Sequence, residues 1–350
     1  MVLAAAIAVV VITLGVSLGW HNNQTIPVNI TPELHYTVEP GNPLSFLSNW
    51  DGPGYLNVAQ YGYPSYIQAG LFPFYPMLIH VVHLAVPSPL DSGLLIAWLS
   101  FVVAIYLYIK LVKRLYDVKD VSNILQAVTF FVLFPTAIFY FATYTESLFA
   151  MLSLAAIHFA FDRRYVLASF LLLLSTATHI TGVFVVVFVA LILLEQKVRL
   201  RRVIFSVIVG SAGLLAYTLY LLIHLHDAFA FLRSQTQVNE WMQHGFVSLV
   251  ENTQYFNAVF VILLIISAFF WWRRRRSFAV YSALFLLIPL LGRQYGGFNR
   301  YVLVAFPMQL MLYEFFRNRK AAFPYAAALM AVIWTYFLLQ YAGGYIGSGG

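Results

Sequence analysis

The chain contains no cysteine, so it can form neither disulfide bonds nor thiolate metal sites, and its redox compartment cannot be inferred. Charged residues are also scarce: they make up 9% of the 350 residues, whereas soluble domains carry about 25%. Hydrophobic residues reach 61%, and the mean hydropathy is +0.80. These proportions exclude a soluble globular enzyme and predict an all-α polytopic membrane protein, because helices satisfy their own backbone hydrogen bonds in lipid.

Apolar segments of spanning or near-spanning length recur along the chain. A crossing needs about 20 residues, and we expect about 11 transmembrane helices, with 1–20 as the first span rather than a cleaved signal peptide. Two of the segments, 165–178 and 180–195, are too short for a full span and are predicted to form a re-entrant hairpin or buried helices. The expected spans are 1–20, 91–112, 121–142, 147–162, 165–178, 180–195, 203–225, 256–272, 277–292, 301–316 and 321–342.

Basic residues are confined to alternate connections between these segments. All but three of the 20 Lys and Arg residues fall on one side; the exceptions are Arg233, Arg293 and Arg300. This asymmetry predicts a cytoplasmic N-terminus and an outward C-terminus. The net charge of +7 is therefore a topology signal, and nucleic acid is not expected as a partner.

The opposite, outward face carries most of the acidic residues and therefore most of the functional polarity. We expect a single transmembrane domain over 1–346, with 347–350 as a flexible tail or linker. The polar outward segments are 21–90, 143–147, 226–255 and 293–300.

The stretch 49–76 differs most from the apolar chain around it, because glycines and prolines interrupt it and it holds a lone carboxylate, Asp51. Such backbone cannot face lipid, and an ionisable group held there is a functional candidate. Short interfacial helices are expected over 55–61 and 71–86, which suits an enzyme that takes a lipid-borne substrate sideways from the membrane.

Three blocks of sequence resemble the PIG-V group of glycosyltransferases, the GPI mannosyltransferase 2 enzymes and their prokaryotic relatives. They occur in the family's order over residues 50–307. The blocks are Trp50-Asp51-x-x-x-Tyr55…Ala59-x-x-Gly62-Tyr63…Phe72-Pro73-x-x-Pro76, then Pro135-Thr136-Ala137-Ile138-Phe139-Tyr140 with Tyr144-Thr145-Glu146-Ser147-Leu148-Phe149, and Asn299-Arg300-Tyr301-Val302-Leu303-Val304-Ala305-Phe306-Pro307.

The resemblance implies a GT-C fold and an inverting transfer of a hexose, with mannose as the expected sugar, from a polyprenyl-phosphate donor to a lipid-linked or glycan acceptor. No cofactor is implied; membrane lipids are the remaining partners. The chain is shorter than the eukaryotic members, which favours a prokaryotic plasma membrane with an outward active site; in a eukaryote the site would face the ER lumen.

The chemistry needs a base near the acceptor hydroxyl. Asp51 is the candidate base; alternatively, it caps the short helix or pairs with an outward arginine. Glu146 is the second catalytic candidate, as a group that positions the acceptor or orients Asp51. Its competing role is that of a carboxylate stabilising the N-terminus of the helix that follows.

The leaving phosphate needs positive charge or hydrogen-bond donors. Arg300 and Arg293 are the candidates, with interfacial snorkelling as the alternative role. Where the family usually has a Thr-Arg-x-x-Gly turn, this chain has Thr178-His179-Ile180-Thr181-Gly182. Protonated His179 is expected to replace the missing arginine in part.

Five further residues are predicted to bind substrate or donor. Tyr301 and Asn299 add hydrogen bonds near Arg300. Trp50, Tyr55 and Tyr63 either stack on the sugar or anchor the loop at the headgroup level.

Two histidine motifs have spacings that a metal ion uses, His80-x-x-His83 and His224-x-His226-Asp227. Isolated polar residues at helix ends explain them more simply, and no metal site is predicted. A lipid-linked-sugar transporter or flippase, or a non-catalytic lipid-binding protein, is the alternative function. The near absence of charges in the middle of the expected spans favours the enzyme.

Overall fold

A computed structural model of the chain describes residue 13 and residues 42–63, 66–234, 247–291 and 297–342. Within these ranges every regular element is a helix and none is a strand. The α-helices are α2 (Asp51–Tyr61), α3 (Phe74–His83), α4 (Pro89–Tyr116), α5 (Val121–Val132), α6 (Glu146–Phe161), α7 (Tyr165–Thr178), α8 (Gly182–Glu195), α9 (Leu200–Leu225), α11 (Val247–Trp272), α12 (Arg276–Leu284), α13 (Leu287–Leu291), α14 (Phe298–Tyr301), α15 (Phe306–Phe316) and α16 (Phe323–Ala342). Short 3-10 helices are η1 (Ser45–Ser48), η2 (Tyr66–Gly70), η3 (Ala137–Tyr140) and η4 (Val302–Val304).

Three helices in the described part of the chain are long and apolar enough to cross a membrane. They are α4, α9 and α16, with 28, 26 and 20 residues. The fold is thus all-helical and consistent with a polytopic membrane protein. A count of eleven crossings stays a prediction, and the expected first span, 1–20, lies outside the described residues except for Thr13.

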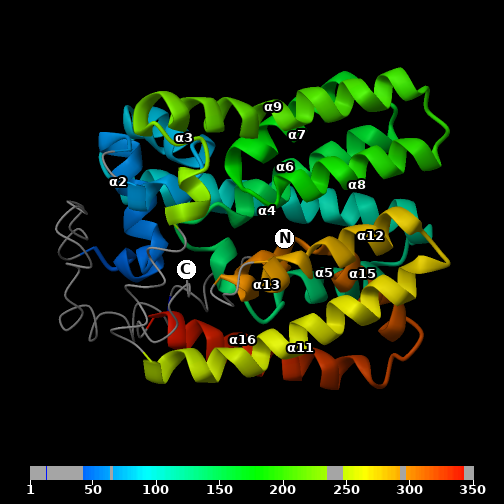
Figure 1. Cartoon of the computed structure of the whole chain (residues 1–350). Coiled ribbons are helices and arrows are strands. Elements are labelled where there is room, and N and C mark those ends of the chain that lie inside the picture. Colours follow the sequence, from blue (N-terminus) through cyan, green and yellow to red (C-terminus); the bar gives the residue numbers. More distant parts are fainter. Residues whose placement is uncertain (1–12, 14–41, 64–65, 235–246, 292–296, 343–350) are drawn as a thin grey trace.

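The connections that carry basic residues gather at one end of the bundle. Figure 1 shows the α8–α9, α11–α12 and α15–α16 connections at the right, whereas α2 and α3 lie at the left. Asp51, the first residue of α2, is therefore at the end remote from most of the positive charge.

Three expected helices are interrupted. The span expected over 277–292 is divided into α12 and α13, and the other two interruptions form part of the polar site. The span expected over 121–142 is wrong as one helix: α5 ends at Val132, and an irregular segment leads to α6. Pro135 explains the end, because proline lacks an N–H and disfavours helical backbone before it. The irregular segment is buried over 136–145, where protein rather than lipid surrounds its backbone.

The expected helix over 301–316 is likewise divided. Helix α15 begins only at Phe306, with Pro307 in its first turn, and Arg300 belongs to the four-residue α14. Arg300 therefore lies outside the regular helix α15 that follows it in the chain.

Other helices match the sequence pattern closely. The predicted interruption between 165–178 and 180–195 falls at His179–Thr181, and α2 ends at Gly62, whose φ of 75° suits glycine. Helices α7 and α9 pack closely because Gly213 has no side chain: a Cβ there would lie 2.1 Å from the Leu173 carbonyl oxygen.

Candidate active site

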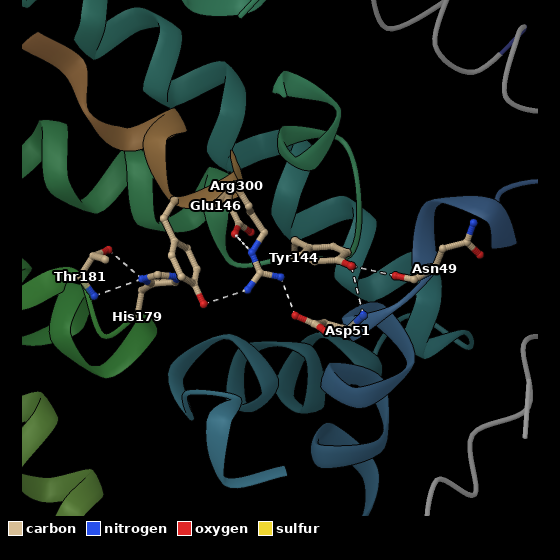
Figure 2. Close-up of polar contacts among 8 residues, drawn as sticks. Asn49, Asp51, Tyr144, Glu146, His179, Thr181 and Arg300 are labelled. Atoms are coloured by element: carbon tan, nitrogen blue, oxygen red, sulfur yellow. Dashed lines mark hydrogen bonds and ion pairs between the residues drawn. The ribbon is translucent and has the colours of Figure 1, made fainter. Parts of the chain in front are cut away.

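The site is built around one arginine held between two carboxylates. Arg300 Nη1 lies 2.5 Å from Asp51 Oδ2, and Arg300 Nε lies 2.8 Å from Glu146 Oε1. Figure 2 shows the guanidinium between the two acids, which come from the starts of α2 and α6. Arg300 is 4% exposed and Glu146 3%, whereas the Asp51 side chain keeps 25% of its exposure. Asp51 is thus the member of the triad that a ligand can reach most directly.

Arg300 remains positively charged despite its burial. Burial disfavours the charge, but the carboxylates of Glu146 and Asp51 outweigh that cost and hold the pKa of Arg300 well above its usual value. Two aromatic rings flank the guanidinium, Tyr144 at 5.1 Å and Tyr301 at 5.2 Å. Arg300 is therefore a fixed cation in a largely apolar surrounding.

The backbone before Asp51 is fixed by two tyrosines from distant parts of the chain. The Tyr144 hydroxyl donates to the Asn49 carbonyl oxygen (2.9 Å) and accepts from the Asp51 N–H (3.1 Å). The Tyr341 hydroxyl, on α16, donates to the Leu47 carbonyl oxygen (3.2 Å), and Asn49 Nδ2 donates to the Tyr341 carbonyl oxygen (2.9 Å). These contacts position the backbone that carries Asp51.

The same loop contains an unusual backbone conformation. Trp50 has a φ of 62° and a ψ of −110°, which a bulky residue adopts only where its surroundings impose it. Gly52 is required for packing: a Cβ there would lie 2.6 Å from Thr143 Oγ1 and 2.7 Å from Ser48 Oγ. Strain beside Asp51 is the kind of feature that active sites retain.

Several buried polar atoms around the triad have no hydrogen-bond partner in the described part of the chain. Arg300 Nε lies 2.8 Å from Glu146 Oε1, but this contact does not have the geometry of a hydrogen bond. Arg300 Nε and Glu146 Oε1 therefore both count as atoms without a hydrogen-bond partner. Buried polar atoms normally find partners, and such a cluster indicates a place for water or a polar ligand. The atoms are Ser48 Oγ, Trp50 Nε1, Thr145 Oγ1, both Glu146 carboxylate oxygens, Asn299 Oδ1 and Arg300 Nε.

His179 joins the edge of this cluster, in the turn between α7 and α8. Its Nδ1 accepts from the Thr181 N–H at 3.2 Å, and its ring lies 4.8 Å from that of Tyr301. Burial, followed by the charge of Arg300, lowers the pKa of His179 to about 3. The expectation that protonated His179 replaces the missing arginine is therefore not supported, since the ring is neutral at physiological pH.

The remaining predicted ligand residues are placed less directly. Tyr55 is buried in the core and packs edge-on against Tyr75 and Tyr144. Its connection to the triad is through Tyr144, whose ring flanks Arg300. Tyr63 donates to the Leu71 carbonyl oxygen and belongs to a separate aromatic cluster with Tyr217. Asn299 is buried beside Arg300, and Arg293 lies outside the described residues.

The histidine motifs make ordinary contacts with the backbone. His80 Nδ1 is 2.9 Å from the Ala59 carbonyl oxygen, and His83 Nδ1 is 2.9 Å from that of Val86. His224 Nδ1 contacts the Tyr220 carbonyl oxygen at 3.0 Å. In the described ranges no three His, Asp or Glu side chains gather as a metal site would require.

Chemically, the arrangement combines an accessible carboxylate, a permanent cation and a buried second carboxylate. A carboxylate can take a proton from a hydroxyl, and a guanidinium can bind phosphate with two parallel N–H donors. Tyr144 and Tyr341 were not among the residues selected from the sequence, although Tyr144 stands within the quoted Tyr144–Phe149 block.

Comparison with known proteins gives limited but consistent support. No family model matches the chain. A GPI mannosyltransferase 2 from Drosophila pseudoobscura pseudoobscura is 31% identical over 121 residues, which is 31% of this chain and 26% of that protein. The match thus spans about a quarter of the relative's length. Over 121 residues the chain is thus similar to a protein named as a GPI mannosyltransferase 2.

Proposed function

We propose that the protein is an integral membrane glycosyltransferase of the GT-C type. It moves a hexose, mannose in the first instance, from a polyprenyl-phosphate donor to a lipid-linked or glycan acceptor. The observation that carries the proposal is the Asp51–Arg300–Glu146 triad, buried among unsatisfied polar atoms. The similarity to a GPI mannosyltransferase 2 supports the class of reaction.

In this mechanism, Asp51 acts as the general base. An acceptor hydroxyl attacks the anomeric carbon while the bond from that carbon to the phosphate oxygen breaks. The hydroxyl proton passes to Asp51, and polyprenyl phosphate leaves with the bonding electron pair. Attack opposite the leaving group inverts the configuration of the sugar. The partial exposure of Asp51 suits a group that meets the acceptor.

Arg300 neutralises the leaving phosphate, and Glu146 holds the guanidinium through Nε. This leaves the Nη groups to face ligands: Nη1 contacts Asp51, and Nη2 lies 3.5 Å from the Tyr301 hydroxyl. Charge stabilisation at a leaving group is the largest contribution that a preorganised site makes to rate.

The geometry of the triad implies a movement during the proposed reaction. In an in-line displacement, the sugar carbon lies between base and phosphate, so the base and the phosphate-binding cation are separated by about 8 Å. The 2.5 Å contact of Arg300 with Asp51 is much shorter. Substrate must therefore separate the two residues, with the donor phosphate replacing Asp51 as the partner of Arg300.

The reaction would take place at the outward end of the bundle. Helix α2, which begins at Asp51, lies opposite the end where the α8–α9, α11–α12 and α15–α16 basic connections gather (Figure 1). By the positive-inside rule the basic end is cytoplasmic, so we place the site on the outer face of a prokaryotic plasma membrane, or the luminal face in a eukaryote.

The test uses purified protein in lipid nanodiscs with radiolabelled polyprenyl-phosphate mannose and a membrane-lipid extract as acceptor. Asp51→Asn is compared with Asp91→Asn, the same change in the first turn of α4, outside the triad. We expect labelled lipid product from wild type and Asp91→Asn, and a loss of at least a hundredfold from Asp51→Asn.

Full activity of Asp51→Asn would refute the assignment of the base. Absence of both turnover and donor binding, with glucose and arabinose carriers also failing, would refute the enzyme and favour a lipid-linked-sugar transporter.

A further inference from the structure

A concavity with positively charged and apolar walls lies at the opposite end of the bundle from Asp51. Its volume is about 750 Å³. It is formed where α6 turns into α7 and where α9 begins, and the α8–α9 connection at that end is visible at the right of Figure 1. The lining residues are Arg163, Arg164, Tyr165, Val166, Leu167, Phe170 and Arg202.

The three arginines are available to an anion. None of the ion pairs in the described ranges involves Arg163, Arg164 or Arg202. The nearest acid in sequence, Asp162, is already engaged: it contacts Arg114 Nη1 at 2.6 Å and His158 Nε2 at 3.3 Å. Asp162 also feels the charge of Arg164, but no carboxylate in the described ranges forms a direct ion pair with any of the three arginines.

Local contacts hold two of these guanidiniums in place. Arg202 lies over the Tyr165 ring at 5.1 Å, and Arg164 lies over the Phe159 ring at 6.0 Å. Arg163 adopts a left-handed conformation with a φ of 59° at the turn between the two helices. Ordered cations of this kind lose less conformational entropy on binding a phosphate than freely rotating ones do.

The rest of the wall is apolar and exposed. Val166, Leu167 and Phe170 are 72%, 39% and 52% exposed, and they follow one another along α7 away from the arginines. A ligand that fits both parts carries a phosphate at one end and a hydrocarbon chain at the other.

We propose that this concavity binds an anionic phospholipid, with its headgroup phosphate on Arg163, Arg164 and Arg202 and an acyl chain along Leu167 and Phe170. Basic pockets between helices at the cytoplasmic surface are suited to such headgroups. The proposal does not depend on the glycosyltransferase reaction, because the concavity shares no residue with the triad.

The test is native mass spectrometry of the full chain with phosphatidylglycerol or phosphatidylcholine added to delipidated protein. The variant Arg163→Gln/Arg164→Gln/Arg202→Gln is compared with Arg273→Gln/Arg274→Gln/Arg276→Gln, which removes the same charge from another basic connection. We expect wild type to prefer phosphatidylglycerol. The first variant should lose that preference with a fall in affinity of about tenfold or more, and the second should retain it.

If both triple variants lost the preference for phosphatidylglycerol equally, general charge attraction would explain the binding and the proposal would be overturned. An unchanged preference in the Arg163/Arg164/Arg202 variant would also overturn it. A second variant, Phe170→Ser, separates lipid from free phosphate. It should weaken retention of phosphatidylglycerol, whereas displacement of the lipid by millimolar inorganic phosphate would show a simple anion site and refute the role of the acyl chain. Circular dichroism and size-exclusion chromatography check that each variant is folded.

Discussion

Arg300 and Asp51 form an ion pair of 2.5 Å, although 249 residues separate them in the chain. Glu146, from a third segment, also contacts Arg300. The single positive charge of Arg300 therefore offsets part of the negative charge of each of the two carboxylates. Because the pair joins the residue proposed as base to the residue proposed as phosphate ligand, its strength affects both stability and activity.

Removal of Arg300 should destabilise the protein strongly. Arg300→Gln leaves the 3% exposed Glu146 without a counter-charge, and loss of one partner of a buried pair costs about 3–5 kcal/mol. The measurement is thermal unfolding in detergent, with Arg201→Gln, an exposed arginine of α9, as the control. The double variant Glu146→Gln/Arg300→Gln should be less destabilised than the two single effects combined; strict additivity would show that the two residues do not interact.

Tyr144 should matter for activity beyond its effect on stability. Tyr144→Phe removes the hydroxyl that bonds both Asn49 and the N–H of Asp51. We expect kcat to fall on the order of tenfold to a hundredfold, because Asp51 is no longer held in position. Tyr281→Phe is the matched control, since it also removes one buried hydroxyl, which donates to the Val304 carbonyl oxygen at 3.0 Å. Equal kcat values for the two variants would show that Tyr144 does not position the base.

Gly213 should tolerate no side chain. In Gly213→Ala, the new Cβ would lie 2.1 Å from the Leu173 carbonyl oxygen, so α7 and α9 must move apart. Overpacking of this kind costs about 1–3 kcal/mol. Thermal unfolding of Gly213→Ala is compared with that of Ala216→Val on the exposed face of α9; a larger loss in the control would contradict this packing.

His179 should make stability depend on pH in the acid range. Its pKa is about 3 in the folded protein and about 6.5 when unfolded, so below pH 6.5 the unfolded chain binds the extra proton. Stability should therefore fall as pH decreases from 6.5 toward 3, by up to about 1.4 kcal/mol per unit. His179→Asn should remove this contribution, which unfolding midpoints at pH 5 and pH 7 would reveal. His224→Asn on exposed α9 is the control, and an unchanged pH dependence in His179→Asn would contradict the prediction.

The sequence predicted the helical class and singled out the residues of the triad. It also offered pairing with an outward arginine as an alternative role of Asp51, and the structure identifies that arginine as Arg300. Asp51, Glu146 and Arg300 stood out because charges are rare in this chain and because each falls in a block similar to the PIG-V group. Contact across 249 residues depends on how the helices pack, which hydropathy does not encode. Glu146 was considered a group that positions the acceptor or orients Asp51, or an acid at a helix N-terminus. It is the first residue of α6, in agreement with the last alternative, and it also contacts Arg300, which the sequence did not predict.

Two features of the structure were not predicted from the sequence, and each has a physical reason. The run 121–142 is apolar enough for a span, yet Pro135 ends the helix early, and side chains of the protein cover the irregular backbone. Tyr144 and Tyr341 were missed because the chain has 23 tyrosines, so that one more near a membrane surface carries little information. Only the structure distinguishes those that bond the Leu47–Asn49 backbone.

The bonds between Tyr341 and the loop before Asp51 also bear on how the protein is made. Asn49 and Tyr341 are 292 residues apart, and α16 carries Tyr341 near its end. A ribosome must therefore synthesise the chain through α16 before the Asp51 loop acquires its full set of bonds. The segments inserted earlier during translation therefore lack these bonds, and the loop before Asp51 should reach its final conformation only when α16 docks.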